Sequence, residues 1–318
     1  MRVLKFGGKS LSSVEKTQNI CKYIKKIYKN DKKLIIVVSA IANATNELIE
    51  TYNKYSLAKI ENKTELAKLL STGETVSSAL FSTMLNSMGI PAKSLSAYEL
   101  EISTFGDPLC SRIAYINKQK ILDCFKSNTV AVVAGFQGIN KNNEITTLGR
   151  GGSDTTAVAL ASIFETDAEI YSDFSGVFCG DPRLLNFKKI KKANFKIMMK
   201  MAKAGAKVLD HRAVKIASDF NTRIISKSST FPEKSGTIIS NIECNLTSIS
   251  EISNLTKITI NFTNNNLDFI VKKVLLCLND IKFYNLTINN EEIHFLVEAT
   301  NKLKILSDLS KKLNLLKK

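Results

Sequence analysis

Short apolar runs along the chain have the pattern of buried parallel strands, because they are rich in β-branched residues and lack polar alternation. The helical segments between them include residues 14–28, an amphipathic stretch, and a small-residue apolar run from residue 157. This alternation predicts an α/β protein with an open, mostly parallel sheet sandwiched by helices. The strands are expected at residues 2–6, 34–38, 129–134, 169–174 and 224–226.

The region between the second and third strands is predicted to be largely helical. Residues 46–70 form a polar helix, which the sequence Ser71-Thr72-Gly73 is expected to end. Glu74 then opens a second helix, where an acidic residue in the first turn favours the helix dipole. Further helices are expected within residues 106–127 and at 196–207.

The last part of the chain has a different pattern, which predicts a small α+β domain. A strand at 257–262 and a helix at 267–278 are followed by strands at 283–288 and 293–298 and an amphipathic helix at 302–315. The pair Asn289-Asn290 is typical of a hairpin turn. Residues 239–254 are interpreted as a polar linker, so two domains are expected, at residues 1–240 and 255–318.

Composition excludes several classes of protein. The chain has 318 residues, 44% of them hydrophobic, which is enough for a large core. No apolar run approaches the roughly 18 to 20 residues of a membrane span, and the first ten residues lack the apolar core of a secretory signal. Six scattered cysteines without a CxxC pair indicate reduced thiols and a cytoplasmic location. With His211 and His294 as the only histidines, no metal-ligating residues are assigned.

The net charge of +16 raises the question of nucleic-acid binding. Only six of the 45 basic residues are Arg, and the lysines are spread over several predicted elements. The chain is also rich in Asn and Ile, so the charge resembles a compositional bias more than a binding surface. Neither a nucleic acid nor a membrane is expected as a partner.

The glycine-rich stretch TTLGRGGSDTTAVALA, residues 146–161, is the clearest candidate for chemistry. A glycine turn that leads into a helix offers backbone N–H groups and the positive end of the helix dipole to a phosphate or carboxylate. Arg150 adds a planar fork for the same kind of ligand, and Asp154 a charge for a cation or a lysine. Ser153 or Asp154 is expected to cap the helix. A purely structural glycine turn is the alternative.

The ends of the first two strands carry further candidates. Gly7 and Gly8 follow the first strand, where glycine lets the backbone approach a phosphate closely. Lys5 on that strand could reach a transferred phosphoryl group. Ser39 follows the second strand and Thr45 comes shortly after, so both are candidates to hold a substrate, although Thr45 could equally be a helix cap.

Several motifs in order resemble those of aspartate kinases, of the amino-acid kinase superfamily. They are KFGGKS at residues 5–10, VVSA with Thr45-Asn46, Gly73-Glu74, GFQG at 135–138, GRGGSD at 149–154, the segment from Ser172 to Arg183, and KVLDHR at 207–212. The resemblance covers about residues 1–240 and implies the amino-acid kinase fold. The C-terminal segment is similar to an ACT module that lacks its last strand, where aspartate kinases usually carry two such modules.

The resemblance implies transfer of a phosphoryl group from ATP, with Mg²⁺, to the side-chain carboxylate of L-aspartate, the first step toward lysine (through diaminopimelate), threonine and methionine. It implies that Lys5 stabilises the phosphoryl group and that Asp154 orients Lys5. Glu74 would bind the substrate ammonium and Arg150 its α-carboxylate, with Ser39 and Thr45 near the reacting carboxylate. The nucleotide-binding residues would be Gly7, Gly8, Ser10, Gly151, Gly152, Ser153, Ser172, Asp173, Phe178, Arg183 and Lys207.

The chain departs from the family pattern at three places. Lys9 replaces a threonine, Phe178 replaces a tyrosine, and Asp210-His211 replaces a His-Pro pair. Three alternatives therefore stay open: a sister kinase for N-acetylglutamate, one for uridylate, and a ligand-binding protein that has lost catalysis. The C-terminal segment could support a homodimer, bind lysine or threonine as effector, borrow a strand from a partner, or be a small α+β cap without a ligand.

Overall fold

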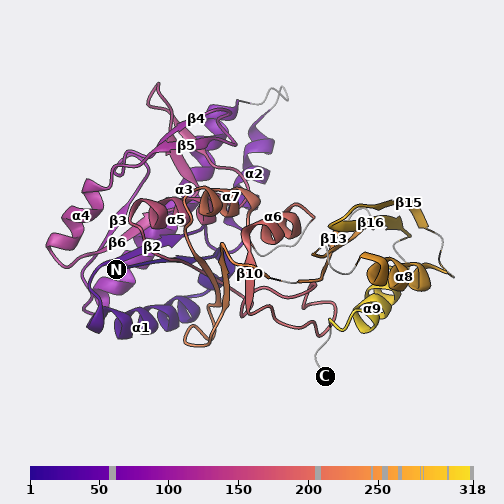
Figure 1. The fold of residues 1–318 in the computed structure, drawn as a ribbon. Helices are drawn as coiled ribbons and strands as arrows, with labels where there is room; N and C mark the ends of the chain where they lie inside the picture. The colour runs from indigo at the N-terminus through magenta and orange to yellow at the C-terminus, as the bar shows by residue number, and fades with distance from the viewer. Residues whose placement is uncertain are drawn as a thin grey trace. The chain divides into compact units, whose positions relative to one another are not determined.

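The structure, a computed structural model, describes most of the chain and divides it into two compact units (Figure 1). The first unit contains residues 1–175 and 216–236, and the second contains residues 176–215 and 237–318. The described residues are 1–56, 62–204, 209–244, 246–252, 257–263, 267–279, 281, 283–298 and 301–315.

The first unit is built on a parallel sheet with the strand order β11-β9-β1-β2-β6-β3. β1 lies in its middle, paired with β2 on one side and β9 on the other. Every residue of β2 and β6 is buried, as their uninterrupted apolar sequences predict. The strands are β1 Arg2–Phe6, β2 Leu34–Val38, β3 Ala92–Leu95, β6 Val130–Ala134, β9 Ala168–Ser172 and β11 Ile224–Ser228.

Helices cover both faces of this sheet, which confirms the predicted class. On one face α1 (Val14–Asn30) and α3 (Lys63–Ser87) bury apolar side chains against alternate residues of β1, β2 and β6. On the other face α5 (Gly152–Ile163) packs against β1, β2 and β9. Lys5 shares that second face, because its neighbours Leu4 and Phe6 belong to the core under α1.

A small second sheet and shorter helices complete the first unit. The sheet has the order β5-β4-β7-β8, and its strand β8 packs against α3. Helix α2 also contacts α3 but has no fully buried residue. The elements are α2 Ala44–Tyr55, β4 Ser103–Phe105, β5 Arg112–Tyr115, α4 Gln119–Lys126, β7 Gln137–Ile139 and β8 Ile145–Thr147. Helix α7, His211–Asp219, has residues in both units.

The predicted break before Glu74 is wrong, because α3 continues from Lys63 to Ser87 without interruption. Gly73 lies inside this helix. A Cβ at Gly73 would come within 2.8 Å of the Cβ of Ala40, so glycine is needed here for close packing and not for a turn. Glu74 therefore lies in the middle of a helix, and its position cannot be explained by the helix dipole.

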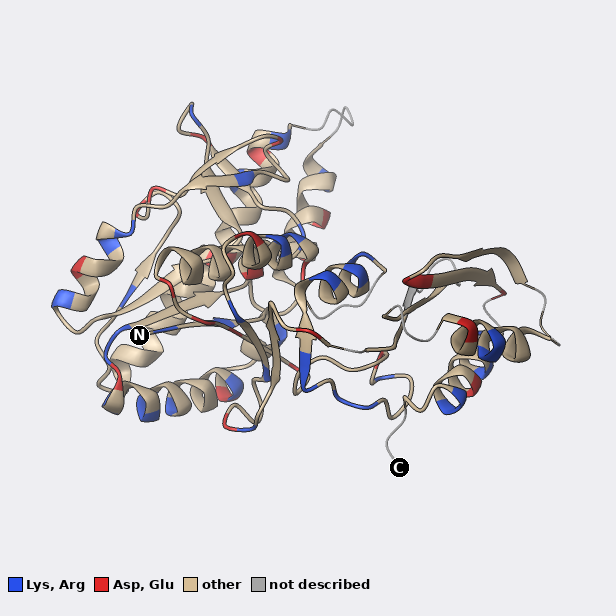
Figure 2. Ribbon diagram, viewed as in Figure 1, with Lys and Arg blue, Asp and Glu red and all other residues tan. Residues whose placement is uncertain are grey.

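The second unit contains a short parallel pair of strands, β10 and β12, and an antiparallel sheet of the order β13-β14-β16-β15. Helices α8 and α9 pack against each other and bury apolar residues. Basic residues are spread over α1, α4, α6 and α9 and not gathered on one element (Figure 2). The elements are β10 Lys192–Asn194, α6 Phe195–Lys203, β12 Thr237–Ser240, β13 Ser248–Ile252, β14 Lys257–Asn261, α8 Leu267–Leu278, β15 Phe283–Ile288, β16 Glu292–Val297 and α9 Lys302–Lys312.

The predicted order β-α-β-β-α of the C-terminal segment is confirmed as β14-α8-β15-β16-α9. The expected linker is wrong at residues 248–252, because these form β13 and pair antiparallel with β14. The edge beside β14 is thus covered by a strand that precedes the module in sequence. No strand from a partner is needed at that edge.

The compact units do not follow the predicted domain boundary at residue 240, since residues 176–215 group with the C-terminal segment. The domain limits stay a prediction. Among the described helices, we find none with the length and apolar character that crossing a membrane requires.

Candidate active site

An ion pair between Lys5 and Asp154 lies at the centre of the first unit. Lys5 Nζ is 2.6 Å from Asp154 Oδ1, and each side chain is only about a tenth exposed, at 12% and 11%. Lys5 comes from the central strand β1, and Asp154 from the first turn of α5, which packs against that strand. The structure therefore brings together two charged residues that lie 149 positions apart in sequence.

The turn after β1 packs directly on the segment that follows β2. A Cβ at Gly8 would come within 2.2 Å of the Ala40 carbonyl oxygen, so no other residue fits there. The Ala42 N–H donates to the Gly8 carbonyl at 3.0 Å, and the Ser39 N–H donates to the Phe6 carbonyl at 3.1 Å. Gly7 donates its N–H to the Tyr171 carbonyl at 3.3 Å, which ties the turn to β9 as well.

The glycine-rich loop starts α5 earlier than the sequence predicts. Gly151 is the N-cap, in the left-handed conformation with φ 71°, and no side chain caps the helix. The predicted cap at Ser153 or Asp154 is wrong, because left-handed glycine begins the helix two residues sooner. Both residues lie in the buried first turn, where the helix dipole favours the Asp154 carboxylate. Arg150 is exposed between the left-handed Gly149 and Gly151.

Glu74 is a buried carboxylate that is only half satisfied. Its Oε1 accepts the Ala40 N–H at 2.9 Å, and the residue is 4% exposed. Within the described part of the chain, its second oxygen, Oε2, has no hydrogen-bond partner. Burial raises the pKa of Glu74 to about 7, against the Ala40 N–H and the positive charge of Lys5, which lower it. A cationic ligand would satisfy this oxygen and restore the charge.

Ser39 and Thr45 lie near the same turn. Ser39 is half-buried at the end of β2, directly before Ala40. Thr45 is the second residue of α2, also half-buried. The N-cap of α2 is Asn43, so Thr45 does not cap this helix.

The residues expected to bind the nucleotide fall into three groups. Ser10, Ser172 and Asp173 belong to the first unit, where Ser172 ends β9. Phe178 and Arg183 belong to the second unit. There Phe178 forms a β-bridge with Lys189, and Arg183 Nε donates to Asp181 Oδ1 at 2.9 Å. Lys207 lies outside the described residues.

The departures from the family pattern make defined contacts. The Lys9 ammonium is 3.7 Å from a carboxylate oxygen of Asp173, with 75% of the lysine side chain exposed. Asp210 accepts the Arg212 backbone N–H at 2.9 Å and the Arg212 Nε at 3.0 Å, at the start of α7. The Asp210-His211 pair thus lies at the start of a helix.

Sequence analysis missed two residues that shape this site. Ala40 contributes a backbone N–H to Glu74, and Gln137 holds the turn of α3 that precedes Glu74. Gln137 Nε2 donates to the Ser71 carbonyl at 2.8 Å, while its Oε1 accepts the Ala97 N–H at 3.0 Å. Ala40 stands in the VVSA motif and Gln137 in the GFQG motif, so their positions gave a signal although no role was assigned to either residue.

Comparison with known proteins decides which family has this arrangement. A model of the amino acid kinase family matches residues 1–226. The aspartokinase of Rickettsia conorii is 34% identical over 308 residues, covering 94% of this chain and 77% of the relative. The chain belongs to the aspartokinases, within the amino acid kinase family.

Two further matches extend this assignment. The aspartate kinase of Pseudomonas fluorescens is 40% identical over 241 residues, covering 74% of this chain and 58% of that relative. The structure of E. coli aspartokinase III in complex with aspartate and ADP superposes with a TM-score of 0.81, at 19% identity, over 99% of this chain and all of that one. At this identity the superposition establishes the aspartokinase fold, which agrees with the predicted class.

Proposed function

We propose that this aspartokinase transfers the γ-phosphoryl group of ATP to the side-chain carboxylate of L-aspartate, giving 4-phospho-L-aspartate. The observation that carries the proposal is the Lys5–Asp154 ion pair beside the half-satisfied, buried Glu74. These groups provide a cation for a phosphoryl group and an anion for an ammonium. They stand next to a glycine turn that packs so closely on the Ala40 carbonyl that no side chain fits at Gly8.

The reaction asks mainly for positioning and charge neutralisation. A carboxylate nucleophile has a pKa of about 4 and is already ionised at neutral pH, so no general base is needed. Lys5 stabilises the charge that develops on the transferring phosphoryl group. Asp154 holds the Lys5 ammonium in place through the 2.6 Å contact. The backbone of Gly7, Gly8 and the 149–154 loop surrounds the phosphates.

Recognition of aspartate needs one anion and one cation. Glu74 Oε2 accepts hydrogen bonds from the substrate ammonium, and Arg150 pairs with the α-carboxylate. Ser39 and Thr45 hold the side-chain carboxylate that receives the phosphoryl group. An acetylated amine has no charge to offer Glu74, which favours a free amino acid over N-acetylglutamate.

A magnesium ion would arrive with the phosphates of ATP. No group of three or more His, Cys, Asp or Glu residues in the described part of the chain is arranged to hold a metal ion. This fits Mg²⁺, which is commonly held by substrate phosphates with one or two carboxylates. Asp154, which pairs with Lys5, is the carboxylate proposed to orient the ion with the phosphates, and the ion would neutralise phosphate charge.

The pKa of Glu74 predicts how aspartate binding depends on pH. Only the ionised carboxylate binds the ammonium, and a pKa of about 7 leaves roughly a tenth of it ionised at pH 6 and nine tenths at pH 8. The KM for aspartate should therefore fall about ten-fold between pH 6 and pH 8. A KM that is constant over this range would contradict the assignment.

A stability measurement gives an independent control for the same group. The pKa of Glu74 in the folded chain is raised above its ordinary 4.5. Ionisation of this group therefore destabilises the ligand-free chain as the pH rises from about 4.5 through 7. Aspartate removes that penalty, so it should raise the melting temperature more at pH 8 than at pH 6.

An acceptor comparison tests the activity itself. ADP release from Mg-ATP is measured with L-aspartate, N-acetyl-L-glutamate and UMP in parallel. Turnover with aspartate alone is the expected result. Turnover with another acceptor would move the chain to a sister function, and no turnover with any of them would favour a chain that has lost catalysis.

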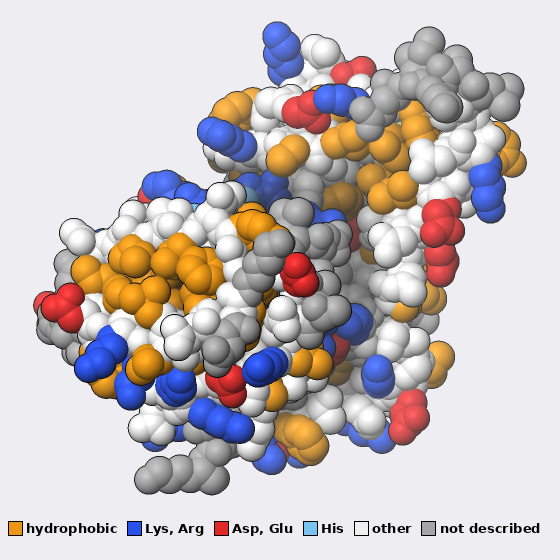
Figure 3. Space-filling model, turned by 90° about the vertical axis from the view of Figure 1, so that its right-hand side faces the viewer, with side chains coloured by type: hydrophobic (Ala, Val, Ile, Leu, Met, Phe, Trp, Pro, Cys, Tyr) orange, Lys and Arg blue, Asp and Glu red, His pale blue; other side chains and the backbone are white. Residues whose placement is uncertain are grey.

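The second unit is proposed to form a homodimer. Figure 3, which faces this unit, shows hydrophobic side chains gathered on its surface. Helix α8 exposes Phe269, Leu275 and Leu276 and bears a groove of about 360 Å³. Strand β15 is an edge strand with mostly exposed side chains, including Tyr284. An exposed apolar patch beside an edge strand is typical of a subunit interface.

Leu276→Glu should convert this dimer to a monomer, because it places a charge in the apolar contact. Size-exclusion chromatography with light scattering measures the mass. The matched control is Val76→Glu on α3, an equally exposed apolar residue of the first unit, at 53% exposure for both. A monomeric unmodified chain, or a dimer that survives Leu276→Glu, would contradict this proposal.

The resemblance to aspartate kinases gives further predictions about nucleotide binding and about an effector. Phe178, Arg183 and Lys207 are proposed to contact the nucleotide. Lysine and threonine remain candidate effectors of the ACT-like module, and adding each to the aspartate assay tests them. A cytoplasmic location, expected from the cysteines, also remains a prediction.

A further inference from the structure

The loop after β11, residues 229–236, connects two segments that are expected to bind the nucleotide. These segments are the turn after β1, which contains Ser10, and the end of β9, which contains Ser172. Ser229 is the first residue of the loop and contacts both. It lies in none of the motifs that the sequence analysis assigned.

Two hydroxyl groups form a continuous chain of hydrogen bonds at this point. Ser10 Oγ donates to Ser229 Oγ at 2.8 Å, and Ser229 Oγ donates to the Ser172 carbonyl at 3.1 Å. The Ser229 N–H donates to the same carbonyl at 2.8 Å. Ser10 is 3% exposed, so water cannot easily replace its acceptor. The Lys9–Asp173 ion pair joins the neighbouring residues of the same two segments.

Other contacts hold the rest of the loop in place, so Ser229 belongs to a well-supported segment. Ser228 Oγ accepts the N–H groups of Thr230 and Phe231, both at 3.2 Å. The Lys26 ammonium pairs with Glu233 at 2.8 Å. The Tyr23 hydroxyl oxygen lies 3.4 Å from the Pro232 carbonyl oxygen.

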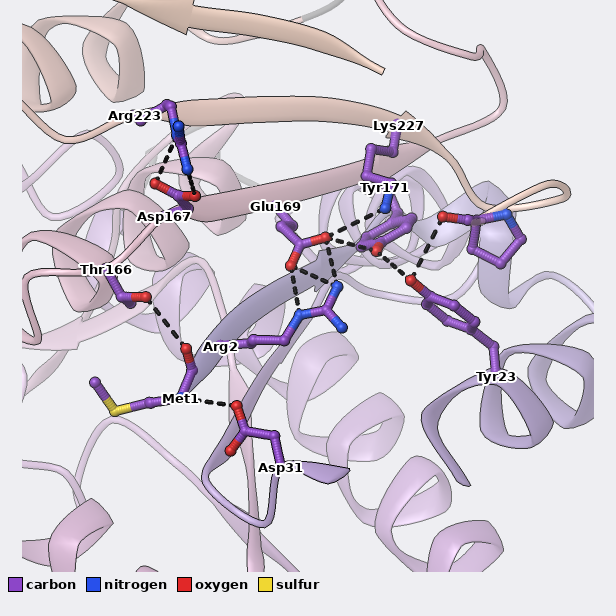
Figure 4. A network of polar contacts seen from close by, with 11 residues as sticks. Met1, Arg2, Tyr23, Asp31, Thr166, Asp167, Glu169, Tyr171, Arg223 and Lys227 are labelled. Carbon is purple, nitrogen blue, oxygen red and sulfur yellow. Dashed lines mark hydrogen bonds and ion pairs between the residues drawn. The ribbon is translucent and has the colours of Figure 1, made fainter. Parts of the chain in front are cut away.

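Tyr23 connects this loop to a polar network under the sheet (Figure 4). Its hydroxyl lies 3.0 Å from that of Tyr171, which donates to Glu169 at 2.8 Å. The Arg2 guanidinium donates two hydrogen bonds to the same carboxylate, from Nε to Oε1 at 2.7 Å and from Nη2 to Oε2 at 2.8 Å. The neighbouring negative charge and burial raise the pKa of Tyr171, so its proton stays in place at neutral pH. The network anchors the loop to β1 and β9.

We propose that Ser229 is a positioning residue for the nucleotide, which holds the turn at residues 7–10 against Ser172 and Asp173. This inference rests on the proposed function, because it assumes that both segments contact ATP. Without the Ser229 hydroxyl, the buried Ser10 loses its acceptor, and the turn must shift to satisfy it. Such a shift starts at Ser10, in the turn whose backbone surrounds the phosphates, whereas the Ala40 N–H and Glu74 on the aspartate side keep each other as partners.

Ser229→Ala should therefore raise the KM for ATP about five-fold, as expected for one lost hydrogen bond. The KM for aspartate should stay within about two-fold, since the Ala40–Glu74 contact is untouched. Ser229→Thr keeps the hydroxyl and should restore the KM for ATP. The matched control is Thr230→Ala, which removes an exposed hydroxyl from the next position and should change neither constant.

Two outcomes would overturn this inference. One is an equal rise in both KM values or a fall in kcat alone, which would indicate a structural effect. The other is failure of the threonine variant to restore the KM for ATP while its melting temperature matches that of the unmodified chain.

ATP binding measured by calorimetry separates this test from the proposed function. An unmodified chain that binds ATP without phosphorylating aspartate would contradict the function, while the affinity of the Ser229 variants would still decide the inference.

Discussion

Lys5→Ala is expected to lower kcat about a thousand-fold, the loss seen when a preorganised charge is removed from a transition state. Lys5 is the residue of β1 that we propose to meet the phosphoryl group, and its Nζ lies 2.6 Å from Asp154 Oδ1. The KM values should change far less, because the ammonium acts mainly as charge develops. Steady-state kinetics at saturating ATP and aspartate measure this effect.

Removal of Lys5 leaves the Asp154 carboxylate buried without its partner, which destabilises the fold. The double variant Lys5→Ala, Asp154→Asn removes both charges and separates stability from catalysis. Because the two residues act as one unit, it should lose little more activity than either single variant. The matched control is Lys227→Met, which removes a lysine of similar exposure, 13%, from the other face of the sheet. Near-normal turnover in Lys5→Ala would refute the assignment.

Glu74→Gln is expected to raise the KM for aspartate about a hundred-fold, because a charged hydrogen bond contributes about 1.5 to 3 kcal/mol. Glutamine can still accept the Ala40 N–H, so the local backbone should be kept. The neutral amide also removes the cost of a buried charge, so the melting temperature should stay equal or rise. The dependence of the KM on pH should disappear in this variant.

A control for Glu74 lies on the same helix. Glu65→Gln changes an exposed glutamate in the first turn of α3 and should leave both KM values unchanged. The KM for ATP should also be unchanged in Glu74→Gln. If the variant binds aspartate as well as the unmodified chain, another residue recognises the substrate ammonium.

The elements with strong local patterns could be predicted from the sequence. β2 and β6 are uninterrupted apolar runs, and α1 has an amphipathic repeat, so each was expected at nearly its observed limits. Gly73 misled the prediction, because a glycine that allows close packing has the same local signal as one that ends a helix. β13 was missed because its pairing with β14 is a tertiary contact that its polar sequence does not indicate.

The candidate site was predictable only where a motif carried it. Lys5 and Asp154 were candidates from the strand end and the glycine-rich loop, and the family resemblance added the role of Glu74. The structure brings Lys5 to Asp154 and places Glu74 within the influence of the Lys5 charge. The open oxygen of Glu74 and its raised pKa depend on burial, which no local pattern contains. Ser229 was not predicted, because a hydroxyl that bridges two distant segments leaves no trace in its own sequence.

Trapping the product with hydroxylamine tests the central claim most directly. The unmodified chain is incubated with Mg-ATP, L-aspartate and hydroxylamine, and both ADP and the hydroxamate are measured. Our account predicts that the β-hydroxamate of aspartate forms in an amount equal to the ADP released. In Lys5→Ala, both products should form at no more than about a thousandth of the rate of the unmodified chain. ADP without hydroxamate, or hydroxamate formed equally by the Lys5 variant, would contradict it.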